Sequence, residues 1–424
     1  MLGLLSALGE GGNVTSMLPS NPSPPWLSII GIGVDGVESL TPRSRLAVET
    51  AQLVIGSERQ LRSVQPLLRK ESVVWPSPLA AGIDMVLARR GSSTCVLSTG
   101  DPFHYGIGST LAPHLVSGEF VCHPAPSSIS IAASRLGWPL QDTDVVSLHG
   151  RSLEGMNRFL HPGRKVIALS WDQRTPAELS DLLVRRGFGP STLYVLESLG
   201  GRDERVRSCT ADAFRFDDVV DLNLVALKLA AEPGASIVPL CNGLPDAAFE
   251  NDGQLTKQDM RAITLSALCP RPGLRLWDVG AGAGSIAIEW MLSHPSCRAI
   301  AIEKDHSRCE RIRRNAASLG VPVMDVVETL APEGLEDLAP PDAIFMGGGA
   351  GTPGNFEACW RALPTGGRLV INAVSLETEA LVLAWYGDLG GELRRVSIDA
   401  AAPLGSMKGW RSAMPVLSWR AVKP

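Results

Sequence analysis

The sequence predicts an α/β protein built from two domains in tandem, and three observations lead to this prediction. At 424 residues, the chain is too long for one ordinary compact domain. In each half, short apolar runs of strand length alternate with amphipathic runs of helix length, a pattern typical of a largely parallel sheet covered by helices. The stretch around residues 236–250 is rich in Pro, Gly and Asn and has no period, which indicates a linker.

The composition excludes several other classes of protein. The chain is 45% hydrophobic and 20% charged, which is typical of a globular protein with material for two cores. Its net charge of -5 argues against a nucleic-acid partner, because phosphate-binding surfaces need clustered Lys and Arg. No apolar run is long enough to cross a bilayer. The 8 cysteines are scattered, without a CxxC pair or a His cluster at metal-ligand spacing, so we expect reduced thiols in a cytoplasmic protein without a metal.

The first half begins with a segment that does not look folded. Residues 1–25 are rich in Gly, Ser and Pro, and their short apolar patch has no basic flank before it, so we predict a disordered tail and no signal peptide. Folded chain is expected from Trp26, where "WLSIIGIGVDG" indicates a buried strand that ends in a glycine turn. Strand-like and helix-like segments then alternate as far as "DLNLVALKLA", residues 221–230.

The second half restarts with a helix over residues 256–270, for which Thr256 is the expected N-cap. A strand at 274–280 and a helix at 285–294 follow, then a strand at 297–305 and a helix at 307–320. Five more strand-like runs are predicted, at 323–328, 341–349, 366–374, 391–400 and 414–422. This order predicts a doubly wound sheet, with three strand-like runs closing the chain.

A glycine-rich loop, "DVGAGAGS", joins the first strand of the second half to the next helix. Glycines at 280, 282 and 284 let the backbone approach a ligand closely, and the helix that starts near Ser285 offers unpaired N–H groups to an anion. A dinucleotide-binding fingerprint would place its third glycine at 285. Because that position is Ser, the G-x-G-x-G form favours a smaller ligand with one amino-acid-like carboxylate.

Two acidic residues extend this motif. Asp278 stands two places before the first glycine, and Glu303 follows Gly284 by 19 residues, at the end of the next predicted strand. An acid at the second position is placed to accept hydrogen bonds from ribose hydroxyls. S-adenosylmethionine meets both demands, with its ribose at Glu303 and its amino-acid portion over the glycines. The neighbouring stretches "RRNAASLG" and "PDAIFMGGG" are also similar to those of class I S-adenosylmethionine methyltransferases.

The strongest signal in the first half is "VLSTGDPFHYGIGSTL", residues 96–111. It predicts a strand, a rigid Gly-Asp-Pro turn, and glycines at 106 and 108 that let the next helix pack closely. With "GIGVDG" before it and "CHPAPSSISIAASRLGW" after it, this half resembles the tetrapyrrole methylase family of class III methyltransferases. It departs from the usual family pattern by having Ala125-Pro126 in place of Gly-Val.

The resemblance implies two α/β lobes and S-adenosylmethionine bound through backbone and serine contacts. The positions that match the family's donor-binding motifs are Val34, Gly100, Asp101, His104, Ser127 and Ser128.

Residues 27–424 as a whole resemble the family of fused, decarboxylating precorrin-6B C-5,15-methyltransferases of cobalamin biosynthesis, and "ESLGGRDERV", "GLPDAAFENDGQLTKQDMRAITLSAL" and "NAVSLE" support this. The resemblance implies a tetrapyrrole methylase domain over residues 26–235 for C-5 methylation and a linker over 236–250. It implies a class I Rossmann-like methyltransferase domain over 251–424 for C-15 methylation and removal of the C-12 acetate carboxyl group. The donor contacts expected in the second domain are Thr256, Asp278, Gly280, Ala281, Gly282, Ala283, Gly284, Glu303 and Ala331.

A precorrin is a polyacid, so cationic side chains are candidates for holding it. His149 and Arg151 of "SLHGR" are expected substrate contacts, although a capped loop with a solvated Arg explains that stretch equally well. Arg261 is a further expected partner of a substrate carboxylate, as is Lys408. Decarboxylation also needs a proton donor. The sequence leaves four candidates open, namely Asp252, Lys257, Asn372 and Lys408.

The expected partners are therefore S-adenosylmethionine and a tetrapyrrole, and the family resemblance implies a homo-oligomer. The alternative within enzymes is an S-adenosylmethionine-dependent methyltransferase acting on another small molecule or an RNA. The acidic net charge and the lack of an Asn-Pro-Pro-aromatic motif in "NAVSLE" argue against an RNA. An oxidoreductase that binds NAD is a rival of a different class, and Ser285 counts against it.

Overall fold

A computed structural model describes residues 25–424, which form two compact units. One unit runs to Trp138 and takes in Glu197–Arg205, and the other comprises Pro139–Leu196 and Val206–Pro424. The predicted disordered tail, residues 1–25, lies outside the described residues except for its last position. No helix within residues 25–424 is long and apolar enough to span a membrane.

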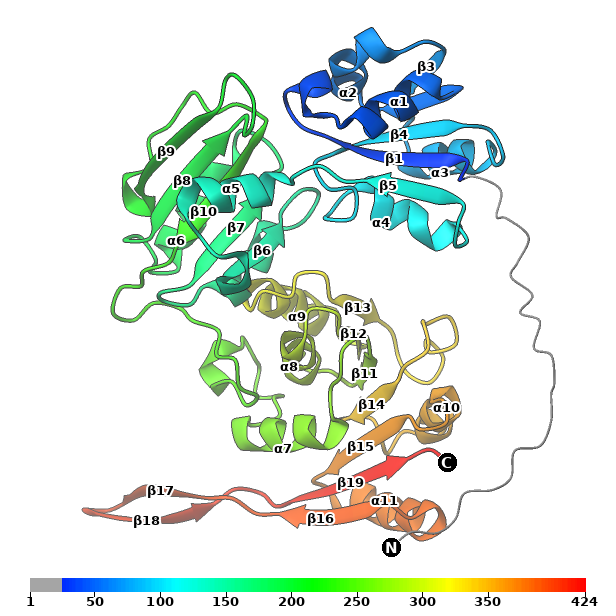
Figure 1. Cartoon of the computed structure of the whole chain (residues 1–424). Coiled ribbons are helices and arrows are strands. Elements are labelled where there is room, and N and C mark those ends of the chain that lie inside the picture. Colours follow the sequence, from blue (N-terminus) through cyan, green and yellow to red (C-terminus); the bar gives the residue numbers. More distant parts are fainter. Residues whose placement is uncertain (1–24) are drawn as a thin grey trace, which may run out of the picture. The chain divides into compact units, whose positions relative to one another are not determined.

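The first unit is built on a five-stranded parallel sheet with the order β3-β2-β4-β1-β5 (Figure 1). Its strands are β1 (Leu27–Ile32), β2 (Leu53–Gly56), β3 (Glu71–Val74), β4 (Thr94–Thr99) and β5 (Phe120–His123). Its helices are α1 (Pro42–Thr50), α2 (Glu58–Ser63), α3 (Leu79–Leu87), α4 (Ile107–Leu111) and α5 (Ser128–Leu136). The strands β1 and β4 are buried along nearly their whole length, because helices cover both faces of a parallel sheet.

The second unit begins with a five-stranded mixed sheet with the order β6-β7-β10-β8-β9, which we call the second lobe. Its strands are β6 (Thr143–Ser147), β7 (Lys165–Leu169), β8 (Thr192–Glu197), β9 (Arg205–Thr210) and β10 (Asn223–Lys228). The helix α6 (Thr175–Arg185) packs its buried Leu179, Leu182 and Leu183 into the core beneath this sheet.

The larger part of the second unit is a seven-stranded sheet with the order β13-β12-β11-β14-β15-β19-β16, which confirms the predicted doubly wound class. Its strands are β11 (Arg275–Val279), β12 (Arg298–Glu303), β13 (Asp325–Glu328), β14 (Ala343–Met346), β15 (Arg368–Ala373), β16 (Glu392–Val396) and β19 (Val416–Val422). Six strands run in one direction, and β19, which lies between β15 and β16, runs opposite to both. Its helices are α7 (Gln258–Leu268), α8 (Ser285–Ser293), α9 (His306–Ser318), α10 (Asn355–Ala362) and α11 (Leu376–Leu389).

The chain between β10 and α7 packs against the seven-stranded sheet's core. Apart from a short 3-10 helix, η7 (Asp246–Ala248), residues 229–257 form no helix or strand. Val238, Leu244 and Phe249 nevertheless belong to the same buried cluster as the core residues of α8. The expected N-cap of α7 is one residue off, because Lys257 holds that position and Thr256 precedes it.

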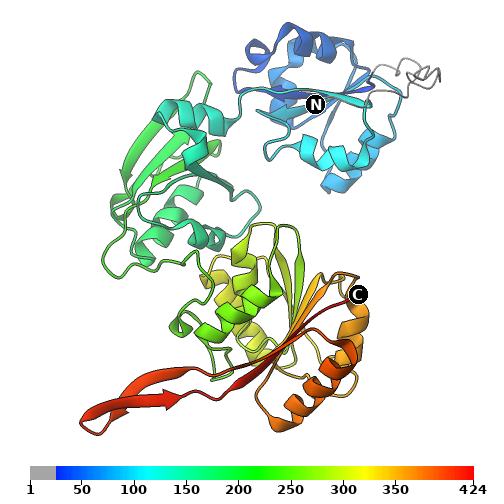
Figure 2. The ribbon, with the colours of Figure 1, turned by 60° about the horizontal axis from the view of Figure 1, so that its bottom comes forward.

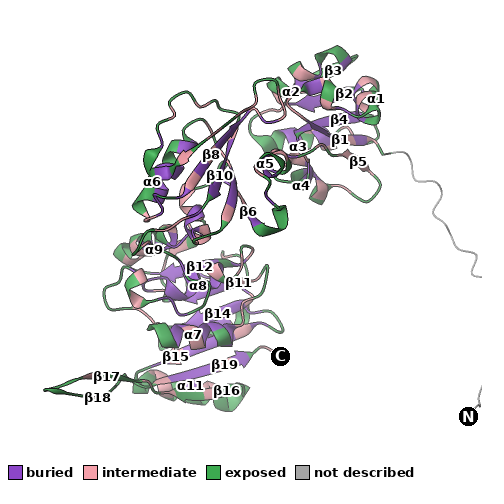
Figure 3. Cartoon of the chain, turned by 60° about the vertical axis from the view of Figure 1, so that its left-hand side comes forward, coloured by how far each residue is buried: buried purple, intermediate pink, exposed green. Residues whose placement is uncertain are grey.

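In this domain, the helices α10 and α11 and a β-hairpin were not predicted from the sequence. The strand-like run at 391–400 divides into β16 and β17 (Asp399–Leu404), and β17 pairs with β18 (Met407–Ser412) in a separate two-stranded hairpin. The hairpin projects away from the seven-stranded sheet, as Figure 2 shows in red. It is exposed along nearly its whole length, in contrast to the buried strands of the sheets (Figure 3).

Within the second unit, a 3-10 helix of the second lobe, η5 (Leu153–Phe159), contacts the ends of two helices. The Asn157 side-chain amide donates to the carbonyl oxygens of Ala317 and Ser318 near the C-terminus of α9, at 3.2 Å each. Arg158 donates to the carbonyl of Leu292 in the last turn of α8 at 3.2 Å. These side chains therefore satisfy carbonyl groups that a helix terminus leaves without an internal partner.

Candidate active sites

In the first unit, the predicted donor motifs meet at the carboxyl ends of neighbouring strands. Gly100 follows β4 with a φ of 62°, and a Cβ there would lie 2.9 Å from the Cα of Ser127. Gly31 is tighter still, since its Cβ would lie 2.0 Å from the carbonyl oxygen of Gly100. Val34 lies in the turn after β1, the strand that pairs with β4 through Ile32 and Thr99. The glycines are therefore required for the close approach of three backbone segments.

Polar groups of these motifs fix their own loops. The Asp101 carboxylate accepts a hydrogen bond from the Phe103 N–H at 2.8 Å, and the His104 N–H donates to the Asp101 carbonyl at 3.1 Å. Ser127 is buried and is the N-cap of α5, accepting from the Ser130 N–H at 3.1 Å. Ser128 is the first residue of that helix. The turn therefore offers backbone groups and a buried serine to a ligand.

Glycines 106 and 108 have the packing role predicted for them. A Cβ at Gly106 would lie 2.7 Å from the carbonyl oxygen of Pro102, and one at Gly108 would lie 2.8 Å from it. Side chains at these positions would push α4 away from the Gly-Asp-Pro turn.

In the second unit, a cavity of about 620 Å³ opens at the carboxyl ends of β11, β12, β14 and β15. This volume lies within the usual range for small-molecule and cofactor sites. Among the donor contacts expected from the sequence, those that line the cavity are Thr256, Asp278, Gly280, Ala281, Gly282, Glu303 and Ala331. Ala283 and Gly284 are not among the lining residues, and a Cβ at Gly284 would lie 2.8 Å from Ile312 of α9.

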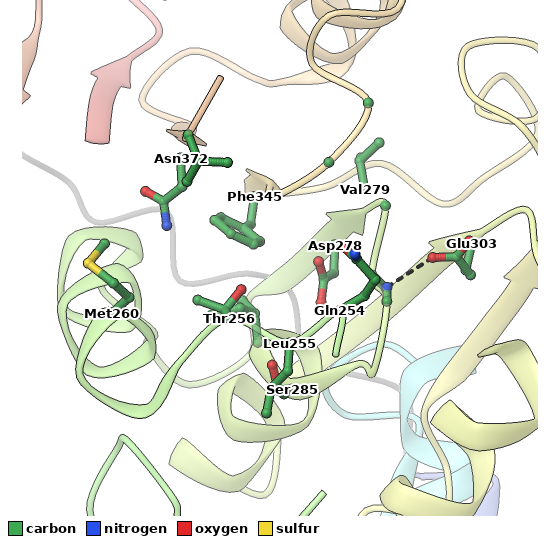
Figure 4. A pocket seen from close by; sticks show the side chains of 18 of the residues that line it. Gln254, Leu255, Thr256, Met260, Asp278, Val279, Ser285, Glu303, Phe345 and Asn372 are labelled. Atoms are coloured by element: carbon green, nitrogen blue, oxygen red, sulfur yellow. Dashed lines mark hydrogen bonds between the residues drawn. The ribbon is translucent and has the colours of Figure 1, made fainter. Parts of the chain in front are cut away.

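The glycine turn and its two acids form one hydrogen-bonded unit, part of which is visible in Figure 4. The Gly282 N–H donates to Oε2 of Glu303 at 2.9 Å, drawn as a dashed line in Figure 4. Oε1 of the same carboxylate accepts from the N–H groups of Lys304 and Asp305 at 3.0 and 3.1 Å. Three of the four acceptor positions of Glu303 are therefore used, and one on Oε2 remains for a ligand hydroxyl.

Asp278 is buried at the base of the cavity, with 2% of its surface exposed. One carboxylate oxygen accepts from the Ala287 N–H in the first turn of α8 at 3.0 Å. Burial raises the pKa of Asp278 to about 7, the Ala287 hydrogen bond opposes this shift, and the charge of Glu303 adds to it. A cationic ligand group beside Asp278 would restore its ionised form.

Several residues of the cavity were not singled out from the sequence. They include Phe345 at the end of β14, Gly347 to Gly349 after it, and Asn355 at the start of α10. A Cβ at Gly280 would lie 2.9 Å from the carbonyl oxygen of Gly348, so the second glycine run lets the two strand-end loops touch. The run "MGGG" was the available signal in the sequence.

The four candidate proton donors are not equivalent. Lys257 and Asn372 line the cavity, and Lys257 is 66% exposed with its Nζ 3.6 Å from Asp246. Asp252 does not line it, and the hydrogen bonds from Arg311 and Arg308 hold the pKa of that carboxyl well below its ordinary value, so it stays ionised. Lys408 lies on the projecting hairpin and does not line the cavity either.

The expected substrate contact Arg261 has a different environment from the one predicted. It is fully buried, and its Nε donates to Glu289 at 2.7 Å while Nη1 donates to Asp246 at 2.9 Å. Further hydrogen bonds run to the carbonyls of Thr256 and Leu244. Because its donors are used inside the protein, we assign Arg261 to holding the segment before α7, in place of a contact with a substrate carboxylate.

The other substrate candidates lie in the second lobe. His149 and Arg151 follow β6 and are exposed, and the His149 ring lies 6.2 Å from the ring of Trp171, which follows β7. In the first unit, Glu197 is buried and bound by Arg205 through two hydrogen bonds of 2.8 Å, so this pair fixes its own loop.

The two sites and their sheets are those of S-adenosylmethionine-dependent methyltransferases, and comparisons with known proteins agree. Residues 27–214 match the family model for tetrapyrrole (corrin/porphyrin) methylases, and residues 247–423 match that for a precorrin methyltransferase domain. The precorrin-6Y C(5,15)-methyltransferase (decarboxylating) of Sinorhizobium sp is 50% identical over 399 residues, which is 94% of this chain and 97% of that protein. The chain belongs to the family of precorrin-6Y C(5,15)-methyltransferases (decarboxylating), and its methyl donor is S-adenosylmethionine.

Of two further relatives, one covers nearly the whole chain and the other covers its second half. The protein of the same name from Mycobacterium tuberculosis (strain CDC 1551 / Oshkosh) is 41% identical over 398 residues, 93% of this chain and 99% of that protein. The solved C-terminal domain of precorrin-6Y C5,15-methyltransferase from Rhodobacter capsulatus is 44% identical, with a TM-score of 0.42 over 44% of this chain and 100% of that one.

Proposed function

We propose that this chain adds methyl groups to C-5 and C-15 of one precorrin and removes the carboxyl group of its C-12 acetate in cobalamin biosynthesis. Residues 26–235 form the C-5 methylase, residues 251–424 form the C-15 methylase and decarboxylase, and residues 236–250 join them. The observation that carries this division is that each half has its own glycine-built turn at the carboxyl ends of parallel strands.

A tetrapyrrole and further copies of this chain are the proposed partners. The cytoplasm is the proposed location, which the eight free cysteines favour.

The methyl transfers need positioning more than acid or base groups. A bridge carbon of the reduced tetrapyrrole attacks the donor methyl group in line, the bond between methyl and sulfur breaks, and S-adenosylhomocysteine leaves. The macrocycle takes over the positive charge of the sulfonium and becomes neutral again by losing a proton to solvent. Holding carbon, methyl and sulfur collinear in a closed site supplies much of the rate. Rigid turns with glycines packed against backbone, such as Gly100 on Ser127 and Gly280 on Gly348, suit this task.

In the second domain, we assign the donor's ribose to Glu303 and its ammonium group to Asp278. The free acceptor position of Glu303 suits a ribose hydroxyl. A buried carboxyl with a raised pKa gains most from a cation, because pairing removes the cost of its charge. Thr256, Ala331 and the backbone of Gly280 to Gly282 complete the contacts. In the first domain, we assign the donor to Val34, Gly100, Asp101, His104, Ser127 and Ser128.

Decarboxylation breaks the bond between the acetate carbon and its carboxylate, releases carbon dioxide and sends the electron pair into the conjugated ring. A proton must then reach the same carbon to form a methyl group. Among the four candidates, we propose Lys257 as the donor, since it lines the cavity and carries an acidic proton. Asp252 is held ionised, and the amide of Asn372 is neither acidic nor free, because it donates to Thr264 at 2.8 Å.

We also propose that the chain works as a homo-oligomer through the hairpin β17–β18. Leu404, Met407 and Trp410 of this hairpin are 64%, 70% and 79% exposed. An isolated two-stranded ribbon is marginally stable in water, and exposed apolar residues on it favour contact with another copy. Shortening the hairpin to a tight turn should lower the mass found by light scattering, whereas an unchanged mass would contradict this assignment.

The test of the two-site proposal uses two variants of the full chain. Purified protein is incubated with precorrin-6B and ¹³C-methyl donor, and NMR with mass analysis locates each new methyl group. Asp101→Ala should stop the methyl addition at C-5 and leave C-15 intact, and Glu303→Ala should do the reverse. If either variant stops both additions, two independent sites are wrong.

A further inference from the structure

The cavity of the second unit extends well beyond the place assigned to the methyl donor. The donor contacts proposed above, which are Asp278, the glycine turn and Glu303, lie over β11 and β12. In the sheet order, β19 lies three positions from β11, which is about 14 Å at the usual strand spacing. Asn372 of β15 and Glu303 accordingly lie on opposite sides of Figure 4, with Phe345 between them. The β15 side of the same cavity is therefore left for a second ligand.

The cavity wall on this side is mostly apolar and is formed by the root of the hairpin β17–β18. Because β19 is antiparallel to β15 and β16, its first residue and the last residue of β16 stand at the same sheet edge as the carboxyl end of β15. The apolar residues that line the cavity here, which we call the root wall, are Val374, Val396, Ile398, Ala413, Met414 and Val416. This side of the cavity therefore suits an apolar ligand surface, such as one face of a macrocycle.

One face of the hairpin continues the root wall outward. Ile398 and Ala413 stand opposite one another, because the Ala413 N–H donates to the Ile398 carbonyl at 2.9 Å. Side chains alternate along a strand, so the next pair on the same face is Ala400 and Arg411, about 7 Å further out. Arg411 is therefore the first cation on the hairpin face that leads out of the cavity.

The guanidinium group of Arg411 is available to a ligand. It is exposed and makes no hydrogen bond or ion pair with another residue within 25–424. On the neighbouring strands, by contrast, Arg394 and Arg420 both pair with Glu392. An unpaired guanidinium beside an apolar wall has the chemistry to bind a ligand with a flat apolar face and carboxylates around its rim.

We propose that Arg411 is a substrate-positioning residue for C-15 methylation, which pairs with a rim carboxylate of the precorrin while one face of the macrocycle lies on the root wall. This assignment rests on the proposed function of the second domain and names a contact within it. A bidentate pair of guanidinium and carboxylate fixes a direction as well as a distance. The macrocycle is thereby held with its plane and its rotation fixed, so that C-15 faces the donor methyl group.

The residues proposed above for contact with another copy lie elsewhere on the hairpin. Leu404 and Met407 form the pair next to its turn, and Trp410, opposite Ala401, is on the other face from Arg411. The root and the tip of the hairpin can therefore have different partners.

The test compares Arg411→Gln and Arg411→Lys in the full chain, with precorrin-6B and ¹³C-methyl donor. Arg411→Gln should raise the KM for C-15 methylation about fivefold and leave kcat within about twofold, because an exposed ion pair contributes mainly to binding. Arg411→Lys should recover part of the loss, since it keeps the charge but not the paired N–H groups. Affinity for S-adenosylmethionine, measured by titration calorimetry, should be unchanged in both variants. A merely structural role of Arg411 would lower that affinity or kcat as well.

Arg271→Gln is the matched control, because Arg271 is exposed shortly before β11 begins, at the sheet edge opposite the cavity. It makes the same change of charge and should leave the KM for C-15 methylation unchanged. An unchanged KM in Arg411→Gln, while the unaltered chain methylates C-15, would overturn this contact alone. A rise in KM that comes with a lower mass in light scattering would assign Arg411 to a subunit contact and overturn the substrate contact. No methyl addition at C-15 by the unaltered chain would overturn the proposed function and this inference with it.

Discussion

The glycine turns of the two domains, at Gly100 and at Gly280 to Gly284, are surrounded by different chemical groups. In the second domain, two buried carboxyl groups, Asp278 and Glu303, face the cavity and bind backbone N–H groups of the glycine turn and α8. In the first domain, Asp101 is only partly buried and binds its own loop, while Ser127 caps α5. From this difference we propose that the second site recognises its donor mainly through charge and the first mainly through backbone shape.

Removing a required glycine should have the largest effect in both sites. Alanine at Gly280 places a Cβ 2.9 Å from a backbone oxygen of Gly348, and alanine at Gly100 places one 2.9 Å from the Cα of Ser127. Backbone must move at each turn, and a displacement of about 1 Å at a reacting centre costs roughly 100-fold in rate. We expect Gly280→Ala to lower C-15 methylation, and Gly100→Ala to lower C-5 methylation, by at least about 100-fold.

Controls for these variants are available in the same chain. Gly137 and Gly366 also have positive φ, of 63° and 80°, but a Cβ there would meet nothing within 4 Å. Alanine at these positions carries the backbone strain without the clash. If Gly366→Ala lowered C-15 methylation as strongly as Gly280→Ala, strain and not close approach would explain the loss.

In the proposed division of labour, only the second domain needs a proton donor. Lys257→Met should lower decarboxylation about 100-fold, the usual scale of general acid catalysis, and leave C-5 methylation unchanged. The measurement is carbon dioxide release, with ¹³C-methyl incorporation at C-15 followed alongside. Equal rates of release in the variant and the unaltered chain would exclude Lys257 as the donor.

The second site should also respond to pH. In the second site, burial raises the pKa of Asp278 to about 7, so below that pH the carboxyl is protonated and would not pair with the donor's ammonium group. Affinity for S-adenosylmethionine should therefore fall as the pH is lowered, by about tenfold between pH 7.5 and 6.0 in titration calorimetry. Asp278→Asn should abolish this dependence in the second site. If the affinity of the second site for S-adenosylmethionine stayed constant over this pH range, charge-based recognition through Asp278 would be wrong.

The smallest expected effect concerns the wall of the second cavity. Asn372 donates to the fully buried hydroxyl of Thr264 at 2.8 Å, which fixes its amide at the end of β15. Thr264→Val removes this hydrogen bond, and kcat/KM for C-15 methylation should fall about fivefold, in line with one hydrogen bond. C-5 methylation, measured in the same reaction, should not change.

Local patterns in the sequence were enough for the strands of the seven-stranded sheet and for the glycine turn of the second domain. The strand, glycine and helix succession at 274–290 predicted β11, the turn and α8, because those elements depend on neighbouring residues. Arg261 was misjudged because an Arg in a polar stretch gives no sign of Glu289, 28 residues away, which pairs with it in the core.

The projecting hairpin shows a further limit of sequence reasoning. Its strands contain Ala, Pro and Gly with little alternation of polar and apolar residues, so periodicity gives no signal for a strand pair. Alternation arises when one face of a sheet is buried, and this ribbon is exposed along nearly its whole length in the single chain.

The contact of η5 with the ends of α8 and α9 is chemically one-sided. Asn157 and Arg158 contribute specific side chains, whereas residues 292, 317 and 318 contribute main-chain oxygen atoms, which nearly any amino acid would supply equally well. Gly320 is an exception on the acceptor side, because a Cβ there would lie 2.6 Å from the backbone nitrogen of Arg158. Substitutions at 292, 317 or 318 should leave these hydrogen bonds intact, whereas substitutions at 157 or 158 should remove them. Relatives should therefore retain the hydrogen-bond donors at 157 and 158, whereas the residue type at 292, 317 and 318 should vary. The sequences on the two sides of this contact can then change at different rates without loss of the contact.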